Sequence, residues 1–188
     1  MAETRSWGGH TGNHGHHFGS AIVNLRDLEP DDVPRLVELN NAAVPAVPTT
    51  AHGEMAALLA LSDFGFAAVD DTDDATLAGF ILGFRPGARY TSENYRFFEA
   101  RGVDSLYVDR IVVTEAARRQ RVGRSLYDRV LELASVEGRA EVTCEVNLDP
   151  PNPGSVAFHE RLGFHEVGQQ ATKNGTVTVL LLAVAVGA

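Results

Sequence analysis

The stretch that decides the fold runs from Leu106 to Tyr127 and reads LYVDRIVVTEAARRQRVGRSLY. Its first half, up to Val113, is an apolar run typical of a buried strand. Its second half is a basic turn that leads into a helix beginning near Val122. This order brings a strand end, free backbone N–H groups and a helix N-terminus to one point, where backbone alone can hold a phosphate. The sequence therefore predicts an anion-binding turn here.

Composition and charge exclude several classes of protein. The chain has 188 residues and a formal net charge of −9, which argues against a nucleic-acid binder. Its single cysteine, Cys144, cannot form an intramolecular disulfide, as is usual in a reducing compartment. No apolar run is long enough to span a bilayer, and the N-terminus lacks the layout of a signal peptide. We therefore expect a cytoplasmic protein that does not bind membranes.

Residues 1–20 differ from the rest of the chain, because they are rich in Gly and His and poor in apolar side chains. Such a segment cannot bury enough surface to offset its ordering entropy. We predict a flexible tail at 1–20, with only adventitious metal binding by its histidines, followed by one domain at 21–188. The acidic turn at 70–74 lacks the ligand spacing of a calcium loop, so we predict no resident metal.

The alternation of apolar patterns predicts an α/β (α+β) fold. The order of elements indicates a mixed, twisted sheet of about seven strands with helices on both faces. Strands are expected at 22–26, 64–69, 76–84, 106–113, 139–146, 164–167 and 176–186, and helices at 30–43, 53–61, 92–100, 122–137 and 155–162.

Two further segments have features that need an explanation. The last strand is apolar on both faces, so it must be covered on both sides or paired across an interface, and this favours a homodimer through that strand. The connector at 88–102 is rich in aromatic residues. It either forms a wall over a site or packs as an aromatic patch on the sheet edge.

Two motifs carry a resemblance to a known family. The sequence RRQRVG at 118–123 resembles the R/Q-x-x-G-x-G/A pyrophosphate loop of the GNAT superfamily of N-acetyltransferases. The sequence NPGSVAFHERLGF at 152–164 resembles the second signature of that superfamily, N-x-x-S/A-x-x-F-Y-x-x-x-G-F. The two motifs occur in the expected order. The resemblance implies a GNAT-like sheet, with central strands splayed at the cofactor site, and acetyl-CoA as co-substrate.

The resemblance also implies which residues bind acetyl-CoA. The pantetheine arm would pair with the strand at Ile111, Val112 and Val113, and the Val113 N–H would hold the oxyanion. The pyrophosphate would lie on the following turn and the second motif, which contribute Arg118, Arg119, Gln120, Arg121, Val122, Gly123, Arg124, Ser125, Asn152, Ser155 and Phe158. The chain departs from the family pattern at Arg121, where a glycine is usual. We expect Arg121 to keep a helical φ, and its side chain either clamps a phosphate or blocks the pocket.

Three residues are candidates for acid–base chemistry. His159 occupies the place of the tyrosine that is the proposed acid in many family members, and an imidazole can give a proton to a thiolate; alternatively, it only packs on its helix. Asp109 or Glu145 could accept a proton from the attacking amine, or bind a cationic substrate. Strand alternation predicts that Asp109 and Ile111 share a face, unless a bulge intervenes. The alternative for Asp109 is an ion pair with a nearby arginine, and Cys144 is expected to be a core residue.

These features predict an acetyl-CoA-dependent N-acetyltransferase whose acceptor, a small cationic amine, attacks the thioester directly in a ternary complex. A non-catalytic acyl-CoA-binding module and a peptide N-terminal acetyltransferase remain alternatives. The peptide enzyme would show a groove between the segments at 30–61 and 90–98.

Overall fold

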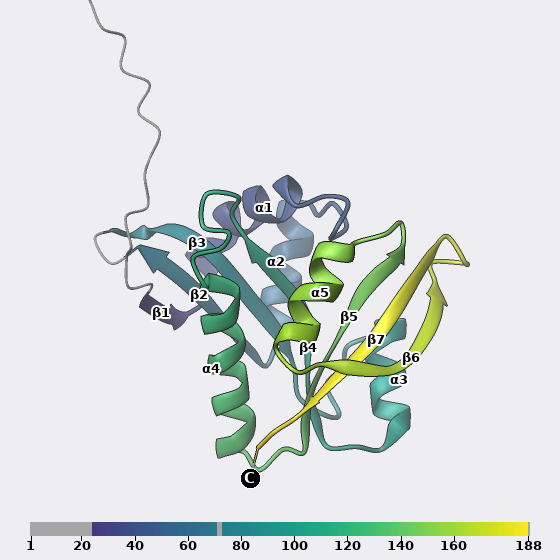
Figure 1. Ribbon diagram of the computed structural model, residues 1–188. Coiled ribbons are helices and arrows are strands. Elements are labelled where there is room, and N and C mark those ends of the chain that lie inside the picture. Colours follow the sequence, from purple (N-terminus) through teal and green to yellow (C-terminus); the bar gives the residue numbers. More distant parts are fainter. Residues whose placement is uncertain (1–23, 71–72, 188) are drawn as a thin grey trace, which may run out of the picture.

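The computed structural model describes residues 24–70 and 73–187 (Figure 1). The predicted tail at 1–20 and the start of the first predicted strand lie outside them. The strands are β1 (Asn24–Asp27), β2 (Phe64–Asp70), β3 (Asp73–Phe84), β4 (Ser105–Val113), β5 (Glu141–Asp149), β6 (His165–Thr172) and β7 (Val177–Ala185). The helices are η1 (Pro30–Asp32), α1 (Val33–Ala42), α2 (His52–Leu61), α3 (Glu93–Arg101), α4 (Val122–Val136) and α5 (Pro153–Arg161). No helix among the described residues has the length and apolar character needed to cross a membrane.

The seven strands form one mixed sheet in the order β1-β2-β3-β4-β5-β7-β6. Only β4 and β5 pair in parallel, and all other neighbours are antiparallel. The predicted fold class is thus confirmed. Element boundaries differ by a few residues. For example, α5 begins at Pro153 because proline suits a first helical position and the Asn152 side chain accepts a 3.2 Å hydrogen bond from the Ser155 N–H.

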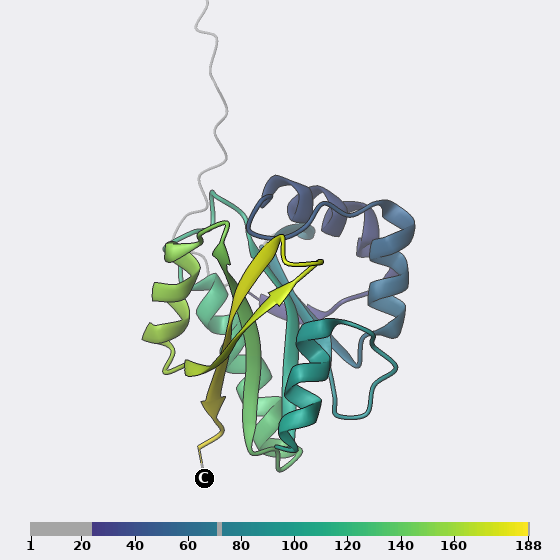
Figure 2. The ribbon, with the colours of Figure 1, turned by 90° about the vertical axis from the view of Figure 1, so that its right-hand side faces the viewer.

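Helices cover both faces of the sheet, as Figure 2 shows, with α4 and α5 on one side and α1, α2 and α3 on the other. The α4 side chains Leu126 and Val130 pack in a core cluster with Leu106 and Val108 of β4. On the opposite face, α1 and α2 pack against β2 and β3, while α3 packs its aromatic residues around Tyr107. The central strands β4 and β5 therefore lie between two helical layers.

A β-bulge interrupts β4 in the middle of its pairing with β3. Gly83 pairs with Val108 and Leu82 pairs with Arg110, so Asp109 has no partner on β3. The bulge inverts the alternation of side chains. Ile111 consequently packs in the same cluster as Val108, on the α4 face. The prediction that Asp109 and Ile111 share a face held only for a strand without a bulge, so it does not apply to β4.

The central strands diverge beyond the bulge. Parallel pairing of β4 and β5 ends at Val108 and Cys144, although β4 continues to Val113 and β5 to Asp149. Figure 1 shows the result as a V, with β1 to β4 leaning one way and β5 to β7 the other. The backbone of β4 beyond Val108 is therefore not paired on its β5 side.

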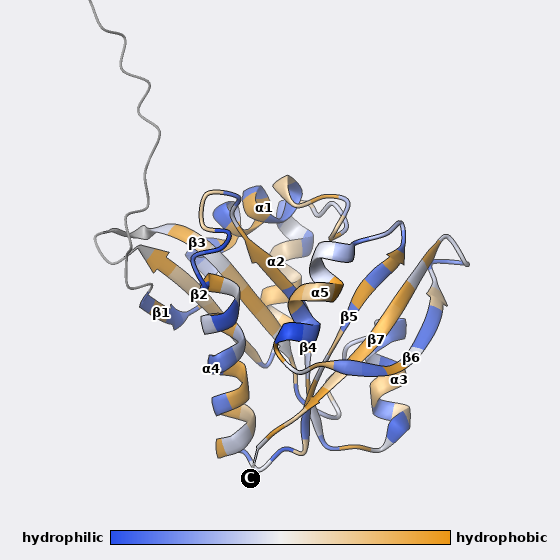
Figure 3. Cartoon of the chain, viewed as in Figure 1, coloured by the Kyte–Doolittle hydropathy of each residue, from blue (hydrophilic) through white to orange (hydrophobic). Residues whose placement is uncertain are grey.

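The last strand is an interior strand of the sheet. Strand β7 pairs with β5 on one edge and β6 on the other, and its residues 179–183 are buried. In Figure 3, β7 is largely hydrophobic, whereas the outer strand β6 is mostly hydrophilic. Both apolar faces of β7 are thus covered within the chain. Of the two arrangements predicted for the last strand, the structure shows coverage within the chain, and a homodimer stays a prediction.

Candidate active site

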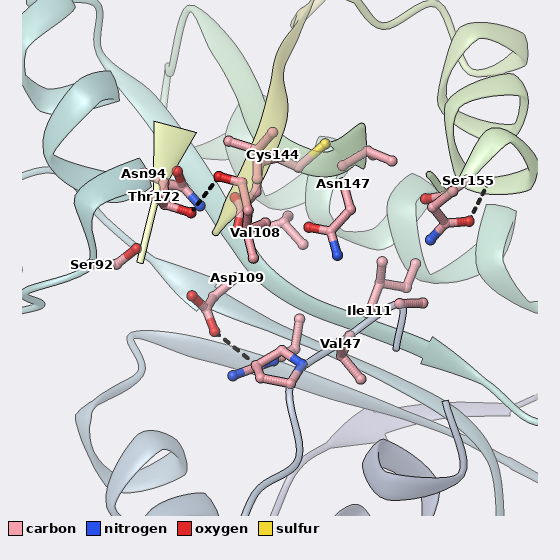
Figure 4. A pocket seen from close by; sticks show the side chains of 18 of the residues that line it. Val47, Ser92, Asn94, Val108, Asp109, Ile111, Cys144, Asn147, Ser155 and Thr172 are labelled. Carbon is pink, nitrogen blue, oxygen red and sulfur yellow. Dashed lines mark hydrogen bonds and ion pairs between the residues drawn. The ribbon is translucent and has the colours of Figure 1, made fainter. Parts of the chain in front are cut away.

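A cavity of about 450 Å³ opens where β4 and β5 diverge. Its walls come from β4 and β5, the loop between α1 and α2, α5, and the turn between β6 and β7. Figure 4 shows Ser92, Asn94 and Thr172 on one side of the cavity and Asn147 and Ser155 on the other. Asp109, Glu145 and His159 all line this cavity. The tertiary structure therefore brings together the three candidates for acid–base chemistry.

The two carboxylates are joined by tyrosine hydroxyls. The Tyr107 hydroxyl donates a hydrogen bond of 2.8 Å to Glu145 Oε2 and lies 3.4 Å from Asp109 Oδ1. The Tyr90 hydroxyl donates a 2.6 Å hydrogen bond to Asp109 Oδ1. Tyr107 stands on β4 between the two helical layers, and Tyr90 is held by stacking on Phe84 with ring centroids 3.9 Å apart. The aromatic connector therefore packs on the sheet and also forms one wall of the site.

Burial controls the protonation of both carboxylates. Removal from water raises the pKa of Glu145, and the nearby Asp109 charge raises it further, whereas hydrogen bonds from Tyr107 and Asn94 act against this rise. Burial likewise raises the pKa of Asp109, opposed first by the charge of Arg110. Two acidic groups with raised pKa values in one cavity are typical of proton-transfer sites.

His159 is almost completely buried and makes two short contacts. Its Nδ1 lies 2.8 Å from the Ser155 carbonyl oxygen, and its Nε2 lies 2.8 Å from the Tyr127 hydroxyl. Desolvation lowers the pKa of His159, although the contact with Ser155 opposes this. His159 thus packs on its helix and also faces the cavity. The two roles predicted for it, proton donor and packing residue, are therefore compatible.

Cys144 behaves as a core residue, as predicted. The thiol is buried beside the Tyr127 hydroxyl, and this burial raises the pKa of Cys144. A thiol that keeps its proton is a poor nucleophile. Acyl transfer through Cys144 is therefore disfavoured.

The basic turn ends in a helix N-terminus with free backbone donors. Helix α4 has Arg121 as its N-cap residue, without a side-chain cap, and its first intrahelical bond to that residue comes from Ser125 N–H. The N–H groups of Val122, Gly123 and Arg124 thus have no acceptor within the helix. The donor set of this turn fits a pyrophosphate group.

Arg121 has a left-handed backbone, with φ of 64°, and Arg119 has φ of 66°. The expectation that Arg121 keeps a helical φ is therefore wrong. Arg121 thus has the backbone conformation that glycine adopts easily. In an arginine this conformation is less favourable, because its Cβ atom crowds the backbone.

Gly123 lies against α5. A Cβ atom added at Gly123 would come within 3.0 Å of Phe158 Cζ and 3.6 Å of Val113 Cγ2. Phe158 also packs near the Tyr127 ring, with centroids 6.0 Å apart. The glycine of the first motif and the phenylalanine of the second are therefore packing partners that join α4 to α5.

The remaining residues predicted to bind the cofactor have different positions. Ile111, Asn152 and Ser155 line the cavity, whereas the Val112 side chain is buried on the opposite face, leaving only its backbone for a ligand. Other side chains of the turn lie near the surface: Gln120 Nε2 bonds the Ala116 carbonyl at 2.8 Å, Arg124 lies 3.5 Å from Asp128, and Arg118 borders a second cavity of about 250 Å³.

Several residues of the site were not predicted from the sequence. Tyr107, Tyr127, Asn94 and Arg110 line or support the cavity but carry no motif. Tyr107 and Tyr127 lie in the apolar strand and the helix of the opening stretch, where their spacing is that of ordinary core residues. Arg110 follows Asp109 in sequence, where alternation would send it to the other face. Only the bulge, which the sequence does not mark, brings it into the site.

Comparisons with known proteins agree with this architecture. The model of the acetyltransferase (GNAT) family matches residues 33–164. Ard1 from Thermoplasma volcanium is 16% identical with a TM-score of 0.69, and the match covers 88% of this chain and 99% of that one. The ribosomal-protein-S18-alanine N-acetyltransferase from Escherichia coli is 18% identical with a TM-score of 0.66, covering 89% and 96%. The structure of yncA from Salmonella typhimurium with its cofactor acetyl-CoA is 16% identical with a TM-score of 0.64, covering 89% and 96%. A search of curated proteins found no significant match.

Proposed function

Because this chain belongs to the acetyltransferase (GNAT) family, we propose that it transfers the acetyl group of acetyl-CoA to an amine bound at Asp109 and Glu145. One observation carries the proposal. Strands β4 and β5 separate beyond Val108 and Cys144, and the gap between them holds both carboxylates. An acceptor amine and an acyl donor can therefore meet there from two sides of the sheet.

Acetyl-CoA would be held mainly by backbone. The unpaired side of β4 at 111–113 offers amide groups to the pantetheine arm, and the N-terminus of α4 offers the N–H groups at 122–124 to the pyrophosphate. Arg118, Arg119 and Arg121 add positive charge around that turn in a chain of net charge −9. When bound, acetyl-CoA supplies a thioester whose carbonyl carbon an amine can attack and whose sulfur leaves as a thiolate.

Glu145 is the proposed base. Its raised pKa suits a group that takes a proton from an ammonium ion near neutral pH and releases it to water. Asp109 holds the amine beside it. Loss of this proton leaves a lone pair on the nitrogen, which forms the C–N bond as the C–S bond breaks. The Val113 N–H is the proposed donor to the carbonyl oxygen, where negative charge develops.

His159 is the proposed acid. In the neutral ring, Nδ1 must carry the proton because the Ser155 carbonyl can only accept, so Nε2 accepts from Tyr127. A second proton on Nε2 converts His159 into a donor, and the Tyr127 hydroxyl beside it can pass that proton to the departing sulfur. In each turnover the nitrogen loses two protons, one to Glu145 before the attack and one to water after the C–N bond forms, and His159 gives one proton to the sulfur.

A peptide N-terminus is a second candidate acceptor. The cavity lies between the loop at 44–48 and the connector at 90–94, the two segments expected to flank a peptide groove. The E. coli structural relative is a ribosomal-protein alanine N-acetyltransferase. The non-catalytic acyl-CoA-binding module is the third candidate.

Free-thiol release from acetyl-CoA, measured with a panel of amines and peptides, tests the proposal. We expect saturable turnover with at least one primary amine and a loss of about 10²-fold or more in Glu145→Gln. Binding of acetyl-CoA without turnover on any acceptor would show a binding module instead. Turnover that Glu145→Gln leaves unchanged would remove Glu145 from the role of base.

A further inference from the structure

The bulge in β4 places two consecutive residues with opposite charges in the same cavity. Asp109 Oδ2 and Arg110 Nε lie 3.2 Å apart, and both residues line the cavity. In a regular strand these side chains would point to opposite faces of the sheet. The site therefore presents an anion and a cation side by side, both toward the space that receives the acceptor.

This ion pair leaves hydrogen-bonding capacity unused. The side chains of Asp109 and Arg110 are only 6% and 15% exposed. Neither Asp109 Oδ2 nor Arg110 Nε has a hydrogen-bond partner, because their contact lacks hydrogen-bond geometry. Buried polar atoms are usually paired, and an unpaired one costs free energy. A ligand with one donor group and one acceptor group would satisfy both atoms.

The lining of the cavity contains ionisable groups of both signs, whereas the whole chain is strongly acidic. Its lining contains two acidic residues, Asp109 and Glu145, and two basic residues, Arg110 and Lys173. The full sequence has a net charge of −9. A cavity built only for a cationic amine would not need a buried guanidinium among its walls, since that charge repels the ligand.

From this geometry we propose that the acceptor is zwitterionic: a free α-amino acid whose ammonium group lies at Asp109 and Glu145 and whose carboxylate binds the Arg110 guanidinium. The proposal rests on the acetyltransferase function proposed above. A guanidinium binds a carboxylate through two parallel N–H donors, which an amide or a simple amine cannot match. The cavity of about 450 Å³ is large enough for an amino acid beside the acetyl end of the donor.

Its free carboxylate distinguishes an α-amino acid from a peptide N-terminus and from a simple amine. A peptide N-terminus has an amide where the amino acid has its carboxylate, and a simple amine has no anionic group at all. Both would leave Arg110 without its ligand. The predicted preference for the amino acid over these two acceptors therefore depends on Arg110. It does not depend on Asp109 and Glu145, which bind the amine.

Matched acceptors test the proposal directly. Thiol release is measured with the twenty L-amino acids, with their primary amides, with the corresponding decarboxylated amines, and with tetrapeptides that have free N-termini. We expect at least one amino acid to exceed its amide and its decarboxylated amine by about 10-fold or more in kcat/KM. Arg110→Gln should raise KM for that amino acid by about 10-fold or more and remove the preference over the amide. The KM for acetyl-CoA should stay within about 2-fold.

Two further variants keep the result interpretable. Arg110→Lys retains the charge but not the planar fork, so it should restore part of the preference even if Arg110→Gln is unstable. Arg96→Gln removes an exposed arginine of α3 that does not line the cavity, and it should behave as the unchanged protein.

The outcomes separate this proposal from the one on which it rests. Preferred turnover of amides, decarboxylated amines or tetrapeptides, insensitive to Arg110→Gln, would overturn the zwitterionic acceptor and leave the acetyltransferase function standing. Binding of acetyl-CoA with no turnover of any acceptor would overturn both.

Discussion

The Tyr127 hydroxyl and His159 Nε2 lie 2.8 Å apart across the interface between α4 and α5. The other ring nitrogen of His159 lies 2.8 Å from the carbonyl oxygen of Ser155, one helical turn earlier. The imidazole is thus held at both ends, and its neutral form directs its only proton at backbone. Its availability as an acid depends on a second proton, which burial makes harder to acquire because it lowers the pKa of His159.

The first prediction concerns His159. His159→Phe should slow turnover by about 10²-fold, the usual contribution of a general acid, with little change in acetyl-CoA affinity. Steady-state kinetics and calorimetric titration with acetyl-CoA measure the two effects. Tyr127→Phe is the matched variant, since it removes one hydroxyl and keeps the ring; it should reduce kcat while the thermal unfolding midpoint stays close to that of the unchanged protein. Normal turnover in His159→Phe would exclude the acid role.

The second prediction concerns the stability of the fold as a function of pH. Burial raises the pKa of Glu145 from 4.5 to about 8. The folded protein therefore keeps a proton that the unfolded chain loses. The resulting stability is fully present below pH 4.5 and is lost as the pH rises toward 8. In urea unfolding, Glu145→Gln should lose less free energy of unfolding than the unchanged protein between these pH values, by several kcal/mol, since each pKa unit corresponds to about 1.4 kcal/mol.

Glu160→Gln, at an exposed position of α5, is the control for this pH series. Its unfolding free energy should follow that of the unchanged protein at every pH. Parallel curves for all three proteins would contradict the raised pKa of Glu145.

The third prediction concerns the contact between α4 and α5. In Gly123→Ala the new methyl group would meet Phe158 Cζ at 3.0 Å, so the ring must move away from the start of α4. We expect a loss of about 1–2 kcal/mol in unfolding free energy and weaker binding of acetyl-CoA. Gly154→Ala is the matched control, because nothing lies within 4 Å of its added Cβ and alanine favours helix. Equal stability of the two variants would show that the Gly123–Phe158 contact does not constrain the helices.

The fourth prediction concerns Arg121, whose φ of 64° is unfavourable for a residue with a side chain. Arg121→Gly should raise the unfolding free energy by about 1 kcal/mol and weaken acetyl-CoA binding by about 3-fold to 10-fold, because a guanidinium near the phosphates is lost. Arg121→Ala separates the two effects, since it keeps the backbone strain and removes the charge. Unchanged affinity in both variants would show that Arg121 does not clamp a phosphate.

Much of the fold could be read from local patterns. The apolar period of residues 122–137 predicted α4, and the apolar run at 106–113 predicted β4. These signals are local, so a single sequence contains them. The interior position of β7 is not local. It depends on a strand inserting between β5 and β6, and the same apolar faces would equally suit a dimer interface.

The candidate site likewise has one part that the sequence predicts and another that only the tertiary structure determines. The order of strand, basic turn and helix by itself predicted an anion-binding turn, because backbone donors follow from sequence order. The resemblance of this turn and of the segment at 152–164 to the GNAT superfamily then implied acetyl-CoA. The tertiary structure alone decided that the consecutive residues Asp109 and Arg110 line the same cavity. A single bulge inverts the alternation of β4, and it arises from the register between β3 and β4, which residues far apart in the chain set together.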